Sequence, residues 1–336
     1  MIITKTPFRM SFFGGGTDMP QFFAEHGGAV ISTTFDKYCY VNVRHLPPFF
    51  DYRTELSYAK TERVTDVEEI RHPAIREAMK MLDMYDIRLT YEADLPARTG
   101  LGTSSSFAVG MLNAFYALKG KYADKRRLAD EAIHLERDLC NEAGGWQDQI
   151  AAAFGGLNRI NFHENGYDVL PIIISPERKR QLNHNLMLYF TGFTRFSSEI
   201  QQSTKQTMKD KTAQLLEMLA LVDEAEQVLT DKTADLDDFG RLLHQSWMLK
   251  KQTGSKISTG SIDELYQKAM EAGALGGKLL GAGGGGFLLF YVQEEWQEAV
   301  SRAMGDLMRV PFAFEDGGTR VIHYTPETYI PRGETR

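Results

Sequence analysis

The chain has 336 residues and a formal net charge of −7, with its 38 basic and 45 acidic side chains spread along the sequence. Because no run of lysine and arginine stands out, we do not expect nucleic acid as a partner. No apolar run is long enough for a signal peptide or a membrane-spanning helix, so we expect a cytoplasmic protein with no membrane partner. The two cysteines, Cys39 and Cys140, exclude a disulfide framework and show no metal-binding spacing.

In the first part of the chain, strands and helices alternate without a steady βαβ rhythm. Residues 2–13 predict a strand or two ending at three consecutive glycines, and the aromatic and β-branched segment 37–43 predicts another strand. Pro73 opens a helix whose apolar residues share one face. An alternating strand over 86–96 follows, and then a glycine loop and a helix that runs to about residue 118.

Helices continue up to the middle of the chain. Asp124 is the expected N-cap of a helix that runs to about residue 142. A short helix over 146–154 comes next, and the segment after it predicts a hairpin around Asn165-Gly166.

The second half begins after the basic segment SPERKRQ, which we interpret as a domain boundary near residue 180. A buried strand over 186–193 precedes a long amphipathic helix over 215–229, further helices to about residue 272, and a glycine loop leading into a strand. We therefore expect an α+β fold with two domains, at residues 1–180 and 181–336.

Three glycine-rich segments are candidates for a functional site. The first, GLGTSSSF over residues 100–107, places glycines and hydroxyl residues directly before a helix. Consecutive backbone N–H groups and the positive end of a helix dipole bind anions, so a polyphosphate is the ligand that fits. A serine-rich helix cap without a ligand is the alternative. The segment lacks the lysine that the P-loop motif requires.

The second segment, GAGGGG over residues 281–286, has the G-x-G-x-x-G spacing of dinucleotide-binding folds. In those folds the motif follows a strand and opens a helix, whereas here it follows a predicted helix and precedes a strand. A Rossmann oxidoreductase is therefore the weaker hypothesis. A run of glycines is costly in entropy, which favours a functional role over a tight turn alone.

The third segment, PFRMSFFGGGTDMP, places Arg9 in a predicted strand and Asp18 after a glycine turn. As part of a pocket wall, Asp18 would accept hydrogen bonds from ligand hydroxyls, and Arg9 would supply positive charge. A turn capped by Asp18 is the alternative.

In this order along the chain, PFRMSFFGGGTD, LPARTGLGTSSS and KLLGAGGGGF resemble the three motifs of the GHMP kinase family, which includes galacto-, homoserine, mevalonate and phosphomevalonate kinases. The resemblance implies an N-terminal domain like domain 2 of ribosomal protein S5 and a C-terminal ferredoxin-like domain. It also implies an enzyme that uses ATP and Mg²⁺ to phosphorylate an alcohol, a reaction that depends on positioning and charge neutralisation.

The resemblance also implies a role for each matching residue. Mg²⁺ would be held by the Ser104 hydroxyl and the Glu136 carboxylate. Glu136 taken alone would be a solvated helix carboxylate, but Asp148 follows it at the spacing found in the family. Asp148 would be the catalytic base, and Arg9 would pair with it. The triphosphate of ATP would be bound by the phosphate loop, namely Gly100, Leu101, Gly102, Thr103, Ser104 and Ser105.

Four longer segments resemble the branch of this family that phosphorylates the anomeric C1 hydroxyl of D-glycero-D-manno-heptose 7-phosphate, on the route to nucleotide-activated heptose for surface glycans. These segments are FFGGGTDMP, EHGGAVISTTFDKY, GGWQDQIAAAFGGLN and TGFTRFSSEI. The residues expected to bind this sugar phosphate are Gly15, Gly16, Thr17, Asp18, Arg195, Gly283 and Gly284. Further candidates for binding the phosphate of the substrate are Lys37, Arg44 and Arg98, each of which could equally form a surface ion pair.

Two alternatives stay open. The chain could be another sugar 1-kinase of this family, acting on an unphosphorylated hexose or a fucose-like sugar, or a non-catalytic sugar-sensing homologue. The presence of Arg9, Glu136 and Asp148 argues against the second alternative. The first motif departs from the galactokinase form, which argues against a galactokinase. The sequence does not indicate an oligomeric state.

Overall fold

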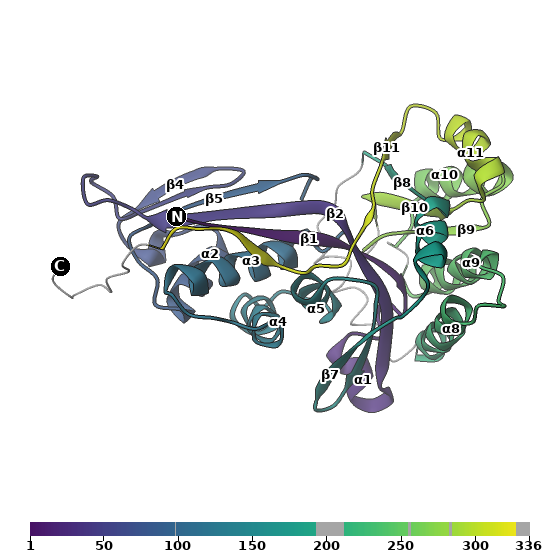
Figure 1. The fold of residues 1–336 in the computed structure, drawn as a ribbon, viewed down its shortest axis with the longest axis horizontal. Helices are drawn as coiled ribbons and strands as arrows, with labels where there is room; N and C mark the ends of the chain where they lie inside the picture. The colour runs from purple at the N-terminus through teal and green to yellow at the C-terminus, as the bar shows by residue number, and fades with distance from the viewer. Residues whose placement is uncertain (98, 193–211, 255–256, 282–283, 327–336) are drawn as a thin grey trace.

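The computed structural model describes residues 1–97, 99–192, 212–254, 257–281 and 284–326. Within these residues, nine strands form one large sheet and four form a second sheet. In Figure 1 the two units lie side by side, and the long strands β1 and β2 run from one to the other. The structure therefore agrees with the predicted mixture of helices and strands in two units. None of the described helices is both long enough and apolar enough to span a bilayer.

The large sheet is built around two long antiparallel strands, β1 (Ile2–Phe13) and β2 (Gly28–His45). One half of β2 pairs with β5 and the other half with β6, so the sheet divides along this strand. Arg9 pairs with Thr34 near the middle of β2, which places Arg9 where the two halves meet. The other strands of this sheet are β3 (Thr54–Ser57), β4 (Thr61–Val64), β5 (Ile87–Ala93), β6 (Asn158–His163), β7 (Gly166–Pro171), β12 (Phe314–Glu315) and β13 (Arg320–Tyr324).

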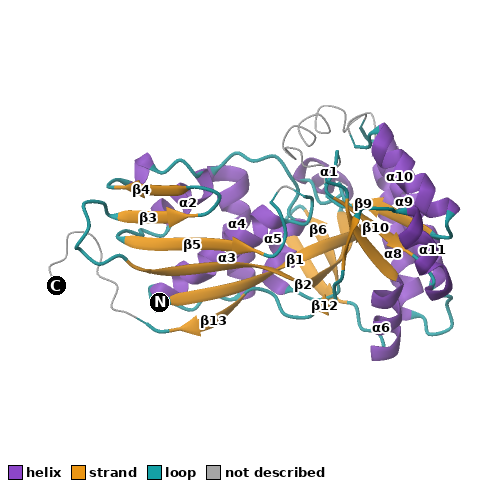
Figure 2. Cartoon of the chain, turned by 90° about the horizontal axis from the view of Figure 1, so that it is seen from above, coloured by secondary structure: helices purple, strands orange, loops and turns teal. Residues whose placement is uncertain are grey.

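Helices cover one face of the large sheet, as Figure 2 shows. These helices are α2 (Pro73–Met81), α3 (Thr103–Leu118), α4 (Lys125–His134) and α5 (Gln147–Phe154), while α1 (Pro20–His26) lies beyond the end of β1. α3 is buried on nearly every side, because its residues are small or apolar all round. The predicted N-cap Asp124 is confirmed by its hydrogen bond from the Arg127 N–H. However, α4 ends at His134, and a π-helical turn (Leu135–Leu139) follows in place of the predicted continuous helix.

The second sheet is antiparallel, in the order β11-β8-β10-β9. Its strands are β8 (Leu186–Phe190), β9 (Gly276–Leu279), β10 (Phe287–Tyr291) and β11 (Met308–Val310), and its helices are α6 (Pro176–Asn185), α8 (Thr212–Thr230), α9 (Asp237–Gln252), α10 (Gly260–Glu271) and α11 (Gln297–Ala303). Phe12 and Phe13 at the end of β1 pack edge-on against Phe239 of α9, with ring centroids 5.3 and 5.1 Å apart. The two units therefore share one hydrophobic core at this end of β1.

Two local elements of the second half differ from those predicted, while the domain boundary itself stays a prediction. The basic segment near residue 180 is part of α6, where Ser175 accepts a hydrogen bond from the Arg178 N–H as N-cap. The glycine segment that begins at Gly281 follows the strand β9 (Gly276–Leu279) and not the predicted helix. In addition, β12 and β13 pair with β2 and β1, so residues beyond the expected boundary return to the first sheet.

Candidate active site

Two of the glycine motifs meet backbone to backbone. A Cβ atom added to Gly281 would lie only 2.2 Å from the Cα atom of Gly100. Both residues have left-handed φ angles, +81° at Gly281 and +82° at Gly100. Only glycine allows both this conformation and this approach. The second unit therefore packs directly against the predicted phosphate loop of the first.

Arg9 connects the phosphate loop to Asp148. Its Nη1 atom donates to the Gly100 carbonyl at 2.7 Å, and its backbone N–H donates to the Leu101 carbonyl at 3.2 Å. Its Nε and Nη2 atoms lie 2.8 and 2.7 Å from Asp148 Oδ1. The Arg9 side chain is 5% exposed and that of Asp148 is 25% exposed, so a ligand can still reach the carboxylate.

Asp148 keeps one carboxylate oxygen free. Both nitrogens of Arg9 bond to Oδ1, and no described residue donates a hydrogen bond to Oδ2. Oδ2 lies 3.5 Å from the position of a Cβ atom added to Gly102, the N-cap of α3. An acceptor oxygen thus lies beside a helix N-terminus, where it can take a proton from a hydroxyl group bound between them.

The start of α3 can bind an anion. Gly102 adopts a left-handed conformation, no side chain caps the helix, and its first turn holds no acidic residue. The amide groups of the first turn and the positive end of the helix dipole are therefore available to a phosphate. Leu101 and Thr103 are buried, whereas Ser104 is exposed. Leu101 packs into the shared core, so its contribution to a ligand would be its backbone.

Glu136 lies under the same helix and is paired with Ser105. The Ser105 hydroxyl donates to Glu136 Oε2 at 2.7 Å, and the Gln149 side-chain amide donates to the same oxygen. Glu136 is only 2% exposed, and no basic side chain among the described residues forms an ion pair with it. A buried carboxylate is unfavourable without a compensating cation, and Mg²⁺ prefers hydroxyl and carboxylate oxygens. The donor set of Ser105 and Glu136 therefore fits Mg²⁺.

The hydroxyl that faces Glu136 differs from the predicted one. The family resemblance pairs Glu136 with Ser104, but Ser104 is exposed, and it is Ser105 that makes the hydrogen bond to Glu136. A role of Ser104 as a metal ligand stays a prediction. Within the described part of the chain, no group of three or more histidine, cysteine, aspartate or glutamate side chains could hold a metal ion. Mg²⁺ would thus depend on phosphate and water oxygens for its other ligands.

The Asp18 carboxylate is buried and already hydrogen-bonded. Its Oδ1 accepts from the Gly16 N–H at 2.9 Å, and its Oδ2 accepts from the Gln147 side-chain amide at 3.0 Å. Burial raises the pKa of Asp18 above its usual value, the negative charge of Asp148 adds to this, and the hydrogen bonds oppose it. Asp18 also fixes the turn before α5, because the backbone N–H of Trp146 donates a hydrogen bond to the backbone carbonyl of Asp18.

The other predicted substrate residues differ in burial and in hydrogen bonding. The Thr17 hydroxyl is buried between the carbonyls of Gly14 and Ala29, at 2.8 and 2.9 Å, and so has a structural role. Gly15 and Gly16 are partly exposed. In the segment GAGGGG, the Gly284 N–H donates a hydrogen bond to the Ile257 carbonyl. Gly283, Arg98 and Arg195 lie outside the described residues.

Two further basic candidates, Lys37 and Arg44, lie along β2. Lys37 forms an ion pair with Asp36 at 2.9 Å. Arg44 lies ten residues along β2 from Thr34, the partner of Arg9, which is roughly 30 Å in an extended strand. Arg44 is therefore too distant to bind the phosphate of a sugar that contacts Asp148.

Lys250 is a site residue that sequence reasoning missed. Its Nζ atom donates to the Gly281 carbonyl, at the contact between the two glycine motifs. Burial and the positive charge of Arg9 lower the pKa of Lys250 to about 8, although Asp18 and Asp148 oppose the change. The available signal was helical spacing, since Lys250 follows the buried residues Ser246 and Trp247 on α9 by four and three positions.

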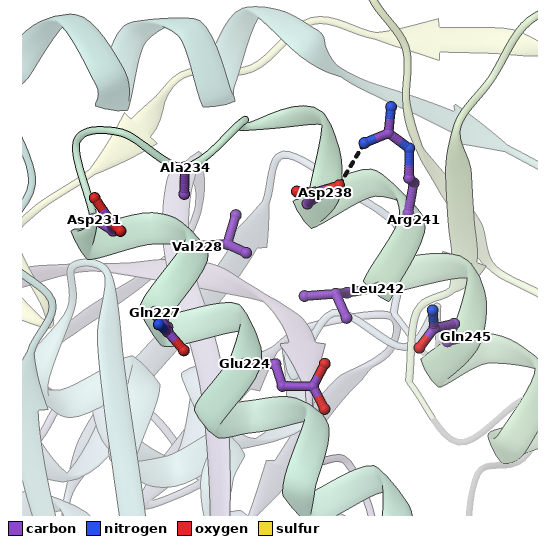
Figure 3. A pocket seen from close by; sticks show the side chains of 9 residues that line it. All are labelled: Glu224, Gln227, Val228, Asp231, Ala234, Asp238, Arg241, Leu242 and Gln245. Atoms are coloured by element: carbon purple, nitrogen blue, oxygen red, sulfur yellow. Dashed lines mark hydrogen bonds and ion pairs between the residues drawn. The ribbon is translucent and has the colours of Figure 1, made fainter.

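A separate hollow of about 380 Å³ lies between α8 and α9 (Figure 3). Glu224 and Gln227 of α8 face Asp238 and Arg241 of α9 across it, and Asp238 pairs with Arg241. None of the predicted site residues lines this hollow. The candidate active site is therefore the convergence of the three glycine motifs.

Comparison with known proteins matches both units. The family model for the GHMP kinases N terminal domain matches residues 70–156, and that for the GHMP kinases C terminal domain matches residues 223–309. A D-glycero-alpha-D-manno-heptose 7-phosphate kinase of Campylobacter jejuni is 29% identical over 305 residues, which cover 87% of this chain and 89% of that protein. A bifunctional fucokinase/GDP-fucose pyrophosphorylase of Arabidopsis thaliana is 22% identical over 86% of this chain, but only 30% of that longer protein is covered.

Solved structures share the fold. A crystal structure described as a D-glycero-D-manno-heptose 1-phosphate kinase from Bacteriodes thetaiotaomicron has a TM-score of 0.77, with 24% identity, over 96% of this chain and 99% of that one. A mevalonate kinase structure has a TM-score of 0.71 at 18% identity, over 94% of this chain and 99% of that one. These similarities confirm the predicted two-domain fold.

Proposed function

The chain belongs to the GHMP kinase family and is an ATP-dependent phosphotransferase with an alcohol acceptor, and from this premise we propose that it is a sugar kinase that phosphorylates the anomeric C1 hydroxyl of D-glycero-D-manno-heptose 7-phosphate. The product would be the 1,7-bisphosphate. Its cofactors would be ATP and Mg²⁺.

One observation carries the proposal. The free Oδ2 atom of Asp148 lies beside Gly102 at the start of α3, and its other oxygen is held by Arg9. A hydroxyl group bound between Asp148 and a phosphate at the helix N-terminus would be in line for phosphoryl transfer. Most of the rate enhancement in such reactions comes from positioning and from neutralising charge.

The residues of the chain would act as follows. The C1 oxygen attacks the γ-phosphorus, the bond from this phosphorus to the bridging oxygen of ADP breaks, and the hydroxyl proton passes to Asp148. Arg9 keeps the Asp148 carboxylate oriented through two nitrogens and places positive charge next to the transferring group. The amides after Gly102 bind phosphate oxygens.

Ser105 and Glu136 would hold Mg²⁺, with Ser104 as the ligand that the family resemblance suggests. Bound there, Mg²⁺ would neutralise charge on the β- and γ-phosphate oxygens. The buried carboxylate of Glu136, which forms no ion pair with a described residue, supports this placement, because a cation would compensate its charge.

The choice of sugar is supported by the Campylobacter jejuni heptose 7-phosphate kinase, which is similar along most of both chains. The longer Arabidopsis thaliana relative, which is named for fucokinase activity, supports the alternative of an unphosphorylated, fucose-like acceptor. The phosphate of the heptose would need basic partners, and Lys37, Arg98 and Arg195 stay candidates, the last two outside the described residues.

ADP release with Mg²⁺ and ATP against a panel of sugars tests the proposal. The panel holds heptose 7-phosphate, mannose, mannose 6-phosphate, galactose and fucose, with Asp148→Ala as the inactive control. We expect a kcat/KM for heptose 7-phosphate at least about 100-fold above that for the other sugars, in line with the loss of a charge-assisted contact. Equal turnover of an unphosphorylated sugar would refute the heptose 7-phosphate assignment and retain the sugar kinase.

A further inference from the structure

Lys250 comes from the second unit but reaches the catalytic groups of the first. It lies near the end of α9, on the face that also carries the buried residues Leu243, Ser246 and Trp247. Residues at this spacing share one side of a helix, so the packing that buries Trp247 also directs Lys250 inward. The Nζ atom then donates to the Gly281 carbonyl.

The position of this ammonium group follows from a chain of contacts. Gly281 packs against Gly100, and the Gly100 carbonyl accepts a hydrogen bond from Arg9 at 2.7 Å. Arg9 in turn binds Asp148 at 2.7 Å. The phosphate loop and the segment GAGGGG thus touch at Gly100 and Gly281. Arg9 donates to the carbonyl of Gly100 on one side of this contact, and Lys250 donates to the carbonyl of Gly281 on the other.

Lys250 has donors and charge left over. An ammonium group has three N–H donors, and only one of them is used by a described residue. No described carboxylate forms an ion pair with Lys250, because Asp148 pairs with Arg9. Asp18, the other nearby carboxylate, accepts its hydrogen bonds from amide groups of Gly16 and Gln147. The unused donors and the uncompensated charge point to an anionic ligand.

A second buried lysine lies next to this group. Lys278 of β9 donates to the Phe12 carbonyl at 2.7 Å, and burial, together with the charges of Lys250 and Arg9, lowers its pKa well below the usual value. Lys278 is only 2% exposed, whereas Lys250 is partly exposed. Lys250 is therefore the lysine of this pair that a substrate can reach.

We propose that Lys250 binds the γ-phosphoryl group of ATP during transfer, as a substrate-contacting residue from the second unit. The inference rests on the proposed kinase reaction, but not on the identity of the sugar. Lys250 would donate two hydrogen bonds to non-bridging oxygens of the γ-phosphorus and would move no proton. Its anchor on Gly281, next to Gly100, places it at the phosphate loop and not at the far end of the sugar.

Nucleotide binding tests this inference without any sugar. The probes are the magnesium complexes of ADP and of the β,γ-imido analogue of ATP, measured by calorimetric titration against wild type, Lys250→Met, Lys250→Arg and Lys251→Met. Lys251 is a matched control, since it is the next lysine on α9 but pairs with Asp263 at 3.2 Å. We expect Lys250→Met to lower the affinity for the imido analogue by at least about tenfold and to leave the affinity for ADP unchanged. Lys250→Arg should keep most of the wild-type affinity for the imido analogue.

Steady-state kinetics give a second readout. Lys250→Met is expected to lower kcat by roughly 10²- to 10³-fold with little change in the KM of the sugar, as for removal of one donor to a transition-state charge. A rise in the sugar KM alone would mean that Lys250 binds the phosphate of the acceptor, and this would overturn the inference. Equal losses for ADP and the imido analogue would also overturn it, because they would indicate a distorted nucleotide site.

The pH profile separates an electrostatic role from a structural one. The charged form of Lys250 exists below its pKa of about 8, so wild-type kcat is expected to fall as the pH rises through this value. Arg9, Asp18, Asp148 and Lys278 are the charged groups that face Lys250. Lys250→Arg does not titrate in this range and should retain its rate to higher pH. An unchanged alkaline limb in Lys250→Arg would contradict the inference.

The binding experiment also separates this inference from the substrate proposal. If Lys250→Met selectively loses affinity for the imido analogue but wild type does not turn over heptose 7-phosphate, only the substrate proposal is refuted.

Discussion

Replacement of Gly281 by alanine tests whether the contact between the two glycine motifs positions the phosphate loop. The added Cβ atom would lie 2.2 Å from the Cα atom of Gly100, whereas ordinary contact begins at 3.4 Å. The two backbones must therefore separate by about 1.2 Å (3.4 minus 2.2) to accept the methyl group. The left-handed φ angle of +81° adds a cost of ~1 kcal/mol for any residue other than glycine.

Both effects can be given a magnitude. A displacement of about 1 Å at a catalytic group can lower a rate ~100-fold, so we expect kcat of Gly281→Ala to fall by about that factor. Overpacking of a well-packed contact costs about 1–3 kcal/mol, which adds to the conformational cost in the free energy of unfolding.

The matched control is Gly120→Ala. Gly120 has a similar φ angle of +65°, but an added Cβ atom would meet no atom within 4 Å. This variant should lose about 1 kcal/mol of unfolding free energy and none of its kcat. Urea denaturation and ADP release measure the two quantities in parallel. A kcat of Gly281→Ala within threefold of that of Gly120→Ala would refute the reasoning that this contact sets the geometry of transfer.

Three other predictions address single residues. Asp148→Asn should lower kcat by ~10²- to 10⁴-fold in the ADP release assay, with an unchanged circular dichroism spectrum; full activity would exclude Asp148 as the base. Ser105→Ala should raise the Mg²⁺ concentration for half-maximal rate more than Ser104→Ala does, and the reverse order would restore Ser104 as the metal ligand. Burial acts to raise the pKa of Glu315, but hydrogen bonds from Arg320 and other donors outweigh it and bring this pKa to about 2, from 4.5. The stability that Glu315 contributes is therefore complete above about pH 4.5 and lost toward pH 2, so the difference in urea midpoint between wild type and Glu315→Gln should shrink over that range. A constant difference would contradict this assignment.

Features with local signals could be predicted from the sequence. The N-cap at Asp124, the hairpin around Asn165-Gly166 and the helix after the phosphate loop are all confirmed, because each depends on residues close together in the chain. α6 was missed because most of its side chains are polar, which leaves no apolar periodicity to detect. The pairing of β12 and β13 with the first sheet joins residues 279 to 322 positions apart, and no local pattern reports such pairing.

The choice between Ser104 and Ser105 shows a limit within the site itself. The sequence pointed to a hydroxyl and a carboxylate that would meet, but neighbouring residues on a helix point about 100° apart. Which of the two faces Glu136 depends on the rotation of α3 against the π-helical turn (Leu135–Leu139), and tertiary packing sets that rotation. The motif therefore identifies the loop, while only the structure distinguishes its serines.

The proposed catalytic groups are divided between the two units. Asp148, Arg9 and the start of α3 belong to the first unit and hold one another through short contacts. Lys250 and Gly281 belong to the second and join them where Gly281 meets Gly100. A lysine in a helix carries no local signal of such a role, because its partners are backbone atoms brought together by the fold. Since Phe12 and Phe13 pack against Phe239 of the helix that carries Lys250, the shared core fixes the ammonium group relative to Arg9. Any change that loosens this core should therefore impair the phosphoryl transfer step before it unfolds either unit.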